Sequence, residues 1–231
     1  MKSFQFKQFS IQQSAAVFRV GTDGVILGAA ASVNHAIKVL EVGTGTGLIS
    51  LMIAQRNDNA EISAIDINQD AVEIAKDNFK RSPFTDRLTV SLQDYKEFTS
   101  EKKYDLVISN PPYFEENLSN KDITARQQTD LSFGSLIEKS ASILNDLGLL
   151  SVIIPFESAL YFEQSCNRNK LYLQKKILIY GMKNSKPKRL VLEFGFHEKE
   201  IVESELVIEK SPRKFTDQYL KITEEFHQFT K

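Results

Sequence analysis

An alternation of short apolar segments with amphipathic ones most constrains the fold of this chain. The first such unit is complete: residues 38–42 predict a buried strand, residues 43–47 (Gly-Thr-Gly-Thr-Gly) a tight loop, and residues 48–55 a helix. Strand and helix alternation of this kind indicates a parallel sheet with helices on both faces. In such sheets ligands bind at the carboxyl ends of the strands, so we expect the functional site at that edge.

Later segments continue the pattern. Expected strands span residues 61–65, 87–92, 103–109, 149–154, 171–180 and 190–196, with 201–208 as a further strand, and expected helices span 25–33, 70–81, 131–144 and 155–167. Residues 114–130 are polar and without periodicity, which is typical of a long exposed loop. No repeat, low-complexity tract or linker divides the chain. We therefore expect a single domain over 1–231, with an N-terminal arm and helix (1–36) and a core with a C-terminal extension (37–231).

Length and composition exclude several classes of protein. The chain has 231 residues, 42% of them hydrophobic, which is enough for one large domain with a sizeable core. No apolar run approaches the roughly 18 residues of a membrane helix, and no signal-peptide core follows the start, so cytoplasmic residence without a membrane is expected. The single cysteine, Cys166, excludes an intramolecular disulfide and argues against a Cys-based metal site.

Polar residues follow the first three predicted strands. Glycines 43, 45 and 47 let the backbone turn tightly and approach a ligand, and their spacing differs from the Gly-x-Gly-x-x-Gly of most dinucleotide binders. Asp66, at the end of the second strand, could accept both hydroxyls of a ribose. Asp94, at the end of the third, could accept from an adenine amino group, although a solvated loop carboxylate is the alternative. The pattern predicts a cofactor that contains an extended adenosine.

The fourth predicted strand ends in Asn110-Pro111-Pro112-Tyr113. The prolines favour extended geometry and cannot donate backbone hydrogen bonds, so the strand should end in a stiff, exposed turn. The Asn110 Oδ1 atom and the Pro111 carbonyl could together hold one planar amino group, and the Tyr113 ring could stack on a flat substrate. Because no side chain here is acidic, basic or nucleophilic, the turn suits a substrate that brings its own weak nucleophile. A plain strand-ending turn is the alternative, since Asn-Pro pairs commonly start turns.

Two further features lie outside these strands. Thr22 and Asp23 precede an Ala-rich helix, where they could cap the helix or face a ligand. The net charge of −1 gives no global attraction to nucleic acid, so any such attraction must be local. Residues 1–22 and 166–190 are free of acids, and the second segment holds eight basic residues. These segments could flank the active edge and grip phosphates, or form a solvated basic face.

Taken together, the motifs resemble those of class I S-adenosylmethionine-dependent methyltransferases that act on amino groups. The narrower resemblance is to the bacterial tRNA1(Val) adenosine-37 N6-methyltransferase family, and it extends over nearly the whole chain, weakening after about residue 195. It rests on Phe4-x-Phe-Lys-Gln-Phe9, Val20-Gly-Thr-Asp-Gly24, Gly43-Thr-Gly-Thr-Gly-Leu-Ile49, Asn110-Pro-Pro-Tyr-Phe114, Ala125-Arg126, Leu131-Ser-Phe133 and Lys188-Arg189. The resemblance implies a Rossmann-like fold with a central, mostly parallel seven-stranded sheet, one antiparallel strand, and helices on both faces.

The resemblance also implies roles for individual residues. S-adenosylmethionine would be the cofactor, no metal would be needed, and the product would be N6-methyladenosine beside the anticodon of a tRNA. The implied catalytic residues are Asn110, Pro111, Pro112 and Tyr113. The implied cofactor contacts are Thr22, Asp23, Glu41, Gly43, Thr44, Gly45, Thr46, Gly47, Asp66, Ile67, Asp94, Tyr95 and Asn110. The implied RNA contacts are Lys7, Arg19, Phe114, Arg126, Lys183, Lys186, Lys188 and Arg189, with no obligate protein partner evident.

Other functions remain open from the sequence. The same turn serves transfer to guanine N2 in rRNA, to adenine N6 in rRNA or DNA, and to glutamine N5 in release factors. Such enzymes often carry an extra domain before the Gly loop, for which the 37 residues before the first strand are too few. A hydride-transferring dinucleotide enzyme is disfavoured by the glycine spacing. A non-catalytic RNA-binding module would need neither the Gly loop nor the Asn110 turn.

Overall fold

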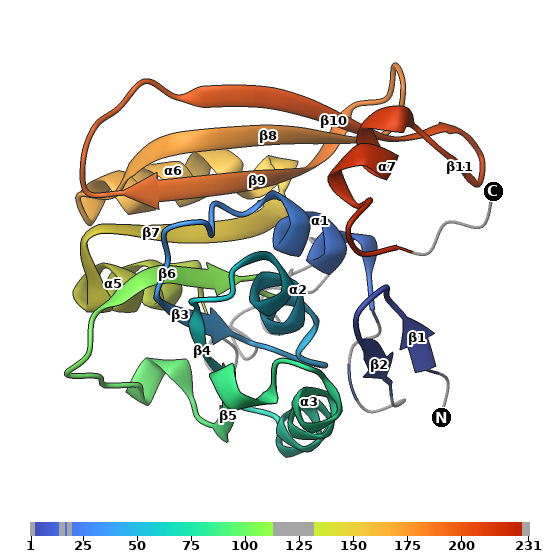
Figure 1. The fold of residues 1–231 in the computed structure, drawn as a ribbon. Coiled ribbons are helices and arrows are strands. Elements are labelled where there is room, and N and C mark those ends of the chain that lie inside the picture. The colour runs from blue at the N-terminus through green and yellow to red at the C-terminus, as the bar shows by residue number, and fades with distance from the viewer. Residues whose placement is uncertain (1–2, 14–16, 18–19, 113–131, 228–231) are drawn as a thin grey trace, which may run out of the picture.

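The computed structural model describes residues 3–13, 17, 20–112 and 132–227. Its central sheet has nine strands in the order β11-β10-β8-β9-β7-β6-β3-β4-β5, and a separate N-terminal hairpin pairs β1 (Ser3–Gln5) with β2 (Ser10–Gln12) (Figure 1). The strands of the central sheet are β3 (Lys38–Val42), β4 (Glu61–Asp66), β5 (Leu88–Leu92), β6 (Tyr104–Ser109), β7 (Leu144–Pro155), β8 (Tyr172–Met182), β9 (Pro187–Gly195), β10 (Val202–Ser211) and β11 (Lys214–Phe215).

Strand directions confirm the predicted fold class and correct the strand number. Strands β5, β4, β3, β6 and β7 are mutually parallel, and β9 runs antiparallel to both of its neighbours, β7 and β8. The predicted total of seven strands is wrong, because β10 adds in parallel to β8 and the short β11 adds antiparallel to β10. The strand expected at 201–208 is confirmed as β10, although only Leu206 is buried along it.

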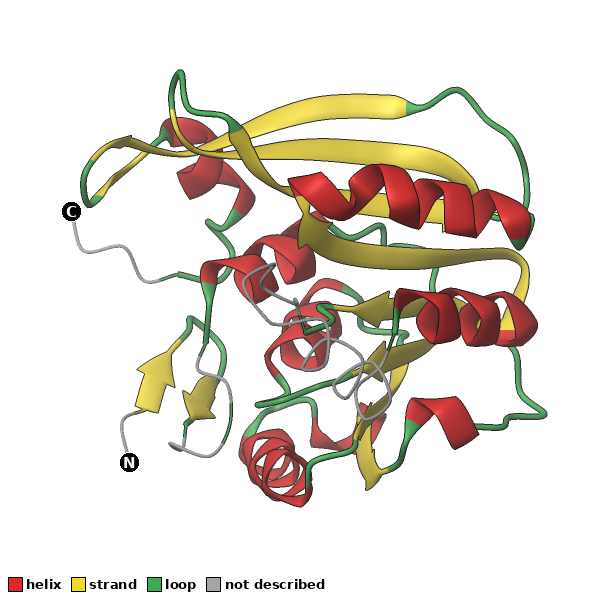
Figure 2. Cartoon of the chain, turned by 180° about the vertical axis from the view of Figure 1, so that it is seen from behind, coloured by secondary structure: helices red, strands yellow, loops and turns green. Residues whose placement is uncertain are grey.

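Helices cover both faces of the sheet. Figure 1 shows α1 (Thr22–Ala30), α2 (Leu48–Arg56), α3 (Gln69–Arg81) and α7 (Asp217–Ile222) on one face, and Figure 2 shows α5 (Phe133–Ile143) and α6 (Ala159–Arg168) on the other. Short 3₁₀ turns are η1 (Thr85–Arg87), η2 (Tyr95–Glu97) and η3 (Phe156–Ser158). Because successive strand residues point to opposite faces, Val39 and Leu40 of β3 enter different hydrophobic clusters.

Buried charges fix α1 on the sheet. Glu193 of β9 is 2% exposed and accepts hydrogen bonds from Ser32 N at 2.7 Å and Ser32 Oγ at 2.6 Å, directly after the helix ends. Lys175 Nζ donates to the Ala30 carbonyl at 2.6 Å, and Arg56 Nη1 donates to two further carbonyls at this end of the helix. Cations at a helix C-terminus complement its dipole and its unpaired carbonyls. The opposite end of α1 is thereby held at the carboxyl edge of the sheet.

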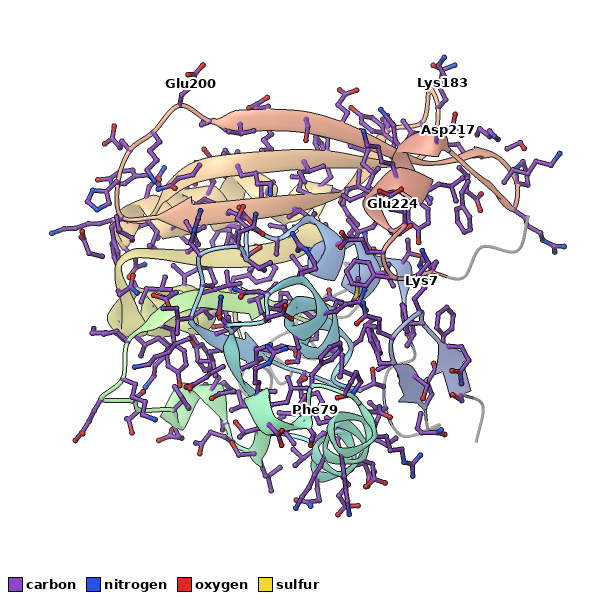
Figure 3. The ribbon with its side chains drawn as sticks, viewed as in Figure 1. Lys7, Phe79, Lys183, Glu200, Asp217 and Glu224 are labelled. Carbon is purple, nitrogen blue, oxygen red and sulfur yellow. The ribbon has the colours of Figure 1, made fainter. Side chains whose placement is uncertain are left out.

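The N-terminal hairpin packs against the same face. Phe6, Phe9 and Ile11 are buried in the cluster that α1 and α2 also line. Lys7 ties the hairpin to the C-terminal segment, because its ammonium group donates to the Glu224 backbone carbonyl; both residues are labelled in Figure 3. Within the described part of the chain, no helix has the length and apolar character that crossing a bilayer requires.

Candidate active site

The predicted site residues lie at one edge of the sheet, where the parallel strands end. Val42, the last residue of β3, pairs with Ile65 of β4 and with Ser109 of β6. The Gly loop, Asp66 and Asn110 follow these neighbouring strands directly, so the chain places them side by side at the carboxyl edge. The Ser109 hydroxyl donates to the Val42 carbonyl at 2.9 Å and ties the two strand ends together.

The Gly loop turns sharply between β3 and α2. Gly43, Gly45 and Gly47 all have positive φ, at 74°, 56° and 80°, a region that L-residues with a Cβ rarely occupy. At Gly47 a Cβ would lie 2.5 Å from the Phe79 ring of α3, so the loop also lies too close to that helix for a side chain. Gly47 is the N-cap of α2 and makes no side-chain cap, which leaves the positive end of the helix dipole facing the loop.

Glu41 lies beneath this loop and is 1% exposed. Its Oε2 atom accepts hydrogen bonds from Thr44 Oγ1 at 2.8 Å, from Ser50 N at 3.0 Å, and from the Ser50 hydroxyl. Its Oε1 atom is buried without a hydrogen-bond partner among the described residues. Burial raises the pKa of Glu41 to about 7, and the nearby charge of Asp66 adds to this, although the bonds from Ser50 and Thr44 oppose it. Glu41 is thus a buried acceptor with only one of its two oxygens hydrogen-bonded among the described residues.

Asp66 and Asp94 both remain partly exposed at the strand ends. Asp66 holds the loop, since Gly45 N donates to its Oδ2 atom at 2.8 Å, and Asn68 N donates to its Oδ1 atom at 2.9 Å. Each carboxylate oxygen can accept more than one hydrogen bond, so capacity for ribose hydroxyls remains. Asp94 caps η2 by accepting from Lys96 N at 2.9 Å.

Two other predicted cofactor contacts, Ile67 and Tyr95, differ in how exposed their side chains are. Ile67 is 62% exposed, directly after Asp66, and its side chain is accessible to a ligand at this edge. Tyr95 is 3% exposed, its hydroxyl lies 3.0 Å from Ser140 Oγ of α5, and burial raises its pKa. A cofactor contact by Tyr95 would therefore have to come from its backbone.

The Asn-Pro-Pro-Tyr turn begins at the end of β6. Asn110 is half-buried, Pro111 is buried and Pro112 is exposed, so within the described residues 110–112 the chain reaches the surface only at Pro112. Four predicted site residues, Tyr113, Phe114, Arg19 and Arg126, lie outside the described residues.

The start of α1 brings together two residues that the sequence assigned to different ligands. Neither Thr22 nor Asp23 caps the helix, because the N-cap is Gly21, which has no side-chain cap bond, so that expectation is wrong. Asp23 Oδ2 instead accepts from Arg189 Nε at 2.9 Å, an ion pair with both side chains about one-third exposed. Arg189 is the register partner of Pro155, the last residue of β7, which puts the pair at the carboxyl edge. Arg189 therefore links the β8–β9 hairpin to the cofactor side of the edge.

Only part of the acid-free segment 166–190 reaches this edge. The hairpin between β8 and β9 presents Lys183, Lys186 and Lys188, all exposed, and Figure 3 shows Lys183 at its tip. Lys176 instead pairs with Glu203 of β10 at 3.3 Å, and Lys175 donates to the Ala30 carbonyl at the end of α1. Lys7, another predicted RNA contact, donates to the C-terminal segment.

Two residues that shape the loop, Ser50 and Asn78, were not predicted from the sequence. Ser50 makes both its backbone and hydroxyl bonds to Glu41. Asn78 of α3 is 1% exposed, and its Nδ2 atom donates to the Thr46 carbonyl at 2.9 Å. A signal for Asn78 was present, because it follows Ala71 and Ala75 along the apolar face of α3 at helical spacing, and a polar residue there needs a partner.

This arrangement fits S-adenosylmethionine. The orphaned Glu41 Oε1 atom is a buried acceptor of the kind that a ligand bound over the loop can complete, directly or through a water. The partly exposed carboxylates of Asp66 and Asp94 suit hydroxyl and amino groups, and Asp66, which bonds to the loop at Gly45, adds a negative charge that favours a cationic sulfonium. No cluster of three or more possible metal ligands occurs within the described residues. The fold and this site define a Rossmann-like class I methyltransferase that depends on S-adenosylmethionine.

Comparisons with known proteins agree with this class. A family model described as "Methyltransferase small domain" matches residues 14–162. A tRNA1(Val) (adenine(37)-N6)-methyltransferase of Flavobacteriaceae bacterium (strain 3519-10) is 54% identical over 99% of this chain and 100% of its own, and a protein with the same description from Phocaeicola vulgatus is 43% identical over 97% of each. The crystal structure of a predicted O-methyltransferase from Agrobacterium tumefaciens shares the fold at 18% identity, with a TM-score of 0.69 over 88% of this chain and 96% of its own.

The chain belongs to the methyltransferase small domain family and, within it, to the tRNA1(Val) (adenine(37)-N6)-methyltransferase family.

Proposed function

We propose that this protein transfers the methyl group of S-adenosylmethionine to the N6 amino group of adenosine 37 in tRNA1(Val). The observation that carries the proposal is the position of the Asn110 turn, one strand away from the Gly loop at the same edge of the sheet. A target base held at Asn110 and a cofactor held at the loop would then face each other. The descriptions of the full-length relatives support adenosine in tRNA over the other amino groups.

Methyl transfer to adenine N6 depends more on how the two reactants are positioned than on acid or base catalysis. The bound cofactor supplies an electrophilic methyl group on a sulfonium, whereas the lone pair of adenine N6 is delocalised into the ring and reacts poorly. Asn110 Oδ1 and the Pro111 carbonyl accept the two amino hydrogens and direct the lone pair toward the methyl group. Positioning and preorganised polar contacts of this kind contribute several kcal/mol, on the order of 7 at best. The proton leaves to solvent after transfer, so no strong base is required.

The tRNA contacts are proposed at the same edge. Adenosine must leave its stack to reach such a turn, and Tyr113 is the proposed stacking partner. Lys183, Lys186 and Lys188 of the β8–β9 hairpin would bind phosphates, since they are exposed beside the edge. Arg189 would attract phosphates by its charge, and its ion pair with Asp23 would hold the hairpin beside the cofactor site.

Transfer of a labelled methyl group tests the reaction directly. We expect incorporation into a transcript of tRNA1(Val), with N6-methyladenosine as the only new nucleoside, and loss of incorporation when adenosine 37 is replaced by guanosine. Methylation that persists on the guanosine transcript, or that proceeds on a release-factor protein without RNA, would reject the assignment.

Asn110→Ala tests the catalytic turn. We expect turnover to fall by about 100- to 1000-fold, because removing one preorganised polar contact commonly costs roughly 2.7–4 kcal/mol of barrier. The matched control is Asn34→Ala, which alters an exposed asparagine at the opposite edge of the sheet, before β3. Unchanged melting temperature and tRNA affinity in both variants would place the effect in the chemical step. Near-normal turnover of Asn110→Ala would contradict the role.

Salt dependence tests the basic hairpin. Replacing Lys183, Lys186 and Lys188 together by Ala should weaken tRNA binding and flatten its dependence on salt, because each phosphate contact releases counterions. The control removes the same charge from exposed lysines at the opposite edge: Lys38, Lys102 and Lys199. Figure 3 shows the separation, with Glu200, next to Lys199, at the other end of the strands from Lys183. Equal effects of the two triple variants would show non-specific attraction only.

Two broader expectations belong to the same proposal. Residues 1–231 would form a single methyltransferase domain, with the arm and helix of 1–36 joined to the core of 37–231, and the burial of Phe6, Phe9 and Ile11 against α1 and α2 supports this. The protein would act in the cytoplasm, where its tRNA substrate is found. Limited proteolysis that released residues 1–36 while leaving a folded, cofactor-binding core would argue against one domain.

A further inference from the structure

Asn78 joins two parts of the chain that are far apart in sequence. Its Oδ1 atom accepts from Gln12 N at 2.8 Å, and its Nδ2 atom donates to the Gln12 carbonyl at 3.2 Å. The side chain thereby offers β2 the pairing that a neighbouring strand would offer. The second hydrogen of the same Nδ2 atom reaches the Thr46 carbonyl in the Gly loop at 2.9 Å.

The Thr46 carbonyl is in the last turn of the loop, directly before the N-cap of α2. The first part of the loop is held by β4, because Gly43 N and Thr44 N both donate to the Ile65 carbonyl, at 2.9 and 3.1 Å. Asn78 holds the last part from the other side. The loop is therefore fixed at both ends, once by the sheet and once by a buried amide of α3.

The N-terminal arm is fixed by the same contact. Ile11 of β2 is fully buried, and Val17 lies beside the loop, since a Cβ on Gly45 would be 4.0 Å from Val17 Cγ1. A change at Asn78 would remove one anchor from the arm and one from the loop at the same time, because a single side chain bonds to both.

We propose that Asn78 is a positioning residue for the methyl donor. It holds the last turn of the Gly loop in the geometry that binds the cofactor, and it makes that geometry depend on the docked N-terminal hairpin. The inference rests on cofactor binding at the Gly loop and not on the identity of the RNA, so it can be tested with the cofactor product alone.

The chain contains a matched control. Asn57, at the other end of α2, is 6% exposed, its Nδ2 atom donates to the Val33 and Ala36 carbonyls at 2.6 and 2.7 Å, and its Oδ1 atom accepts from Asn59 N at 2.9 Å. Asn57 thus makes the same set of bonds as Asn78, but far from the Gly loop. Asn→Asp at either position keeps the shape and the accepting oxygen while removing two donated bonds.

Calorimetry with S-adenosylhomocysteine separates positioning from stability. Both Asn78→Asp and Asn57→Asp should lower the melting temperature by several degrees, because each leaves two buried or part-buried carbonyls facing a carboxylate. At a temperature where both are folded, only Asn78→Asp should weaken binding, by on the order of tenfold, which corresponds to the loss of about one hydrogen bond. Hydrogen exchange should also rise in the peptides of β2 and the Gly loop for Asn78→Asp alone.

If Asn78→Asp and Asn57→Asp bind S-adenosylhomocysteine with affinities within twofold of each other, the proposal is overturned and Asn78 contributes to stability alone. If Asn78→Asp does not fold, Asn78→Ser, which keeps one donor, provides the same comparison against Asn57→Ser. A wild-type protein that binds S-adenosylhomocysteine but methylates no tRNA would refute the proposed substrate without touching this inference.

Discussion

The buried carboxyl of Glu41 predicts a specific dependence of stability on pH. Its pKa is raised from 4.5 to about 7, chiefly by burial. A raised pKa in the folded state means that the protonated form is favoured by folding. The contribution to stability is therefore full below about pH 4.5 and is lost as the pH rises to about 7. The difference between the folded-state and unfolded-state pKa values, at about 1.4 kcal/mol per pKa unit, corresponds to about 3 kcal/mol of folding free energy.

Glu41→Gln removes this titration while keeping the shape. The amide oxygen can still accept from Thr44 Oγ1 and Ser50, and the NH₂ group takes the place of the unpartnered Oε1 atom. Burying that NH₂ group without an acceptor costs about 1–3 kcal/mol, but this cost is the same at every pH. Wild-type protein should thus lose about 3 kcal/mol more than the variant between pH 4.5 and pH 8.

Urea unfolding at intervals across that range measures the difference. The free energies of unfolding of the two proteins should converge or cross as the pH rises, because only the wild type must ionise a buried carboxyl. Parallel curves would refute the reasoning, since they would mean that Glu41 is already ionised in the fold at low pH. In the same range, binding of the cationic cofactor should tighten with pH in the wild type and not in the variant.

Two further substitutions test local geometry. Gly47→Ala should cost about 2–4 kcal/mol of stability, from backbone strain plus the overlap with Phe79, whereas Gly43→Ala, with nothing within 4 Å, should cost only the strain of about 1–2. Equal losses by urea unfolding would show that the overlap relaxes freely. Asp23→Asn and Arg189→Gln should couple by about 0.5–1 kcal/mol in a double-mutant cycle on stability, as expected for a partly exposed pair. Additive effects would mean that the ion pair contributes nothing.

Periodicity predicted the core strands because burial on both faces leaves near-continuous apolar runs. Strands β3, β4 and β6 are of this kind, and their carboxyl ends gathered the glycines, Asp66 and Asn110 as expected. The strand expected at 201–208 is present as β10, but its place in the sheet was harder to predict, because only Leu206 is buried along it and its sequence is mostly polar. The pairing of β10 beyond β8 follows from tertiary packing, which a local pattern does not encode.

Side-chain partners were the least predictable part of the site. Asp23 and Arg189 are 166 positions apart, and Asn78 joins residues 66 and 32 positions away. Nothing local distinguishes Asp23 as the partner of Arg189 from Asp23 as a cap or a ligand. The polar position on the apolar face of α3 could have marked Asn78 as a residue with a buried partner, but only the folded chain shows that one partner is the Gly loop.

Counting basic residues along segment 166–190 overestimates how many of them are available to bind nucleic acid. Side chains alternate between faces, so Lys175 turns toward Glu193 and α1, whereas Lys176 turns toward Glu203 on the neighbouring strand. These cations are committed to the fold and would add little attraction for phosphate. The hairpin tip, formed where the alternation ends, keeps its lysines exposed. A tRNA surface on this protein should therefore depend on the few cations at the carboxyl edge. Arg189 is one of them, and its Nε atom already donates to Asp23.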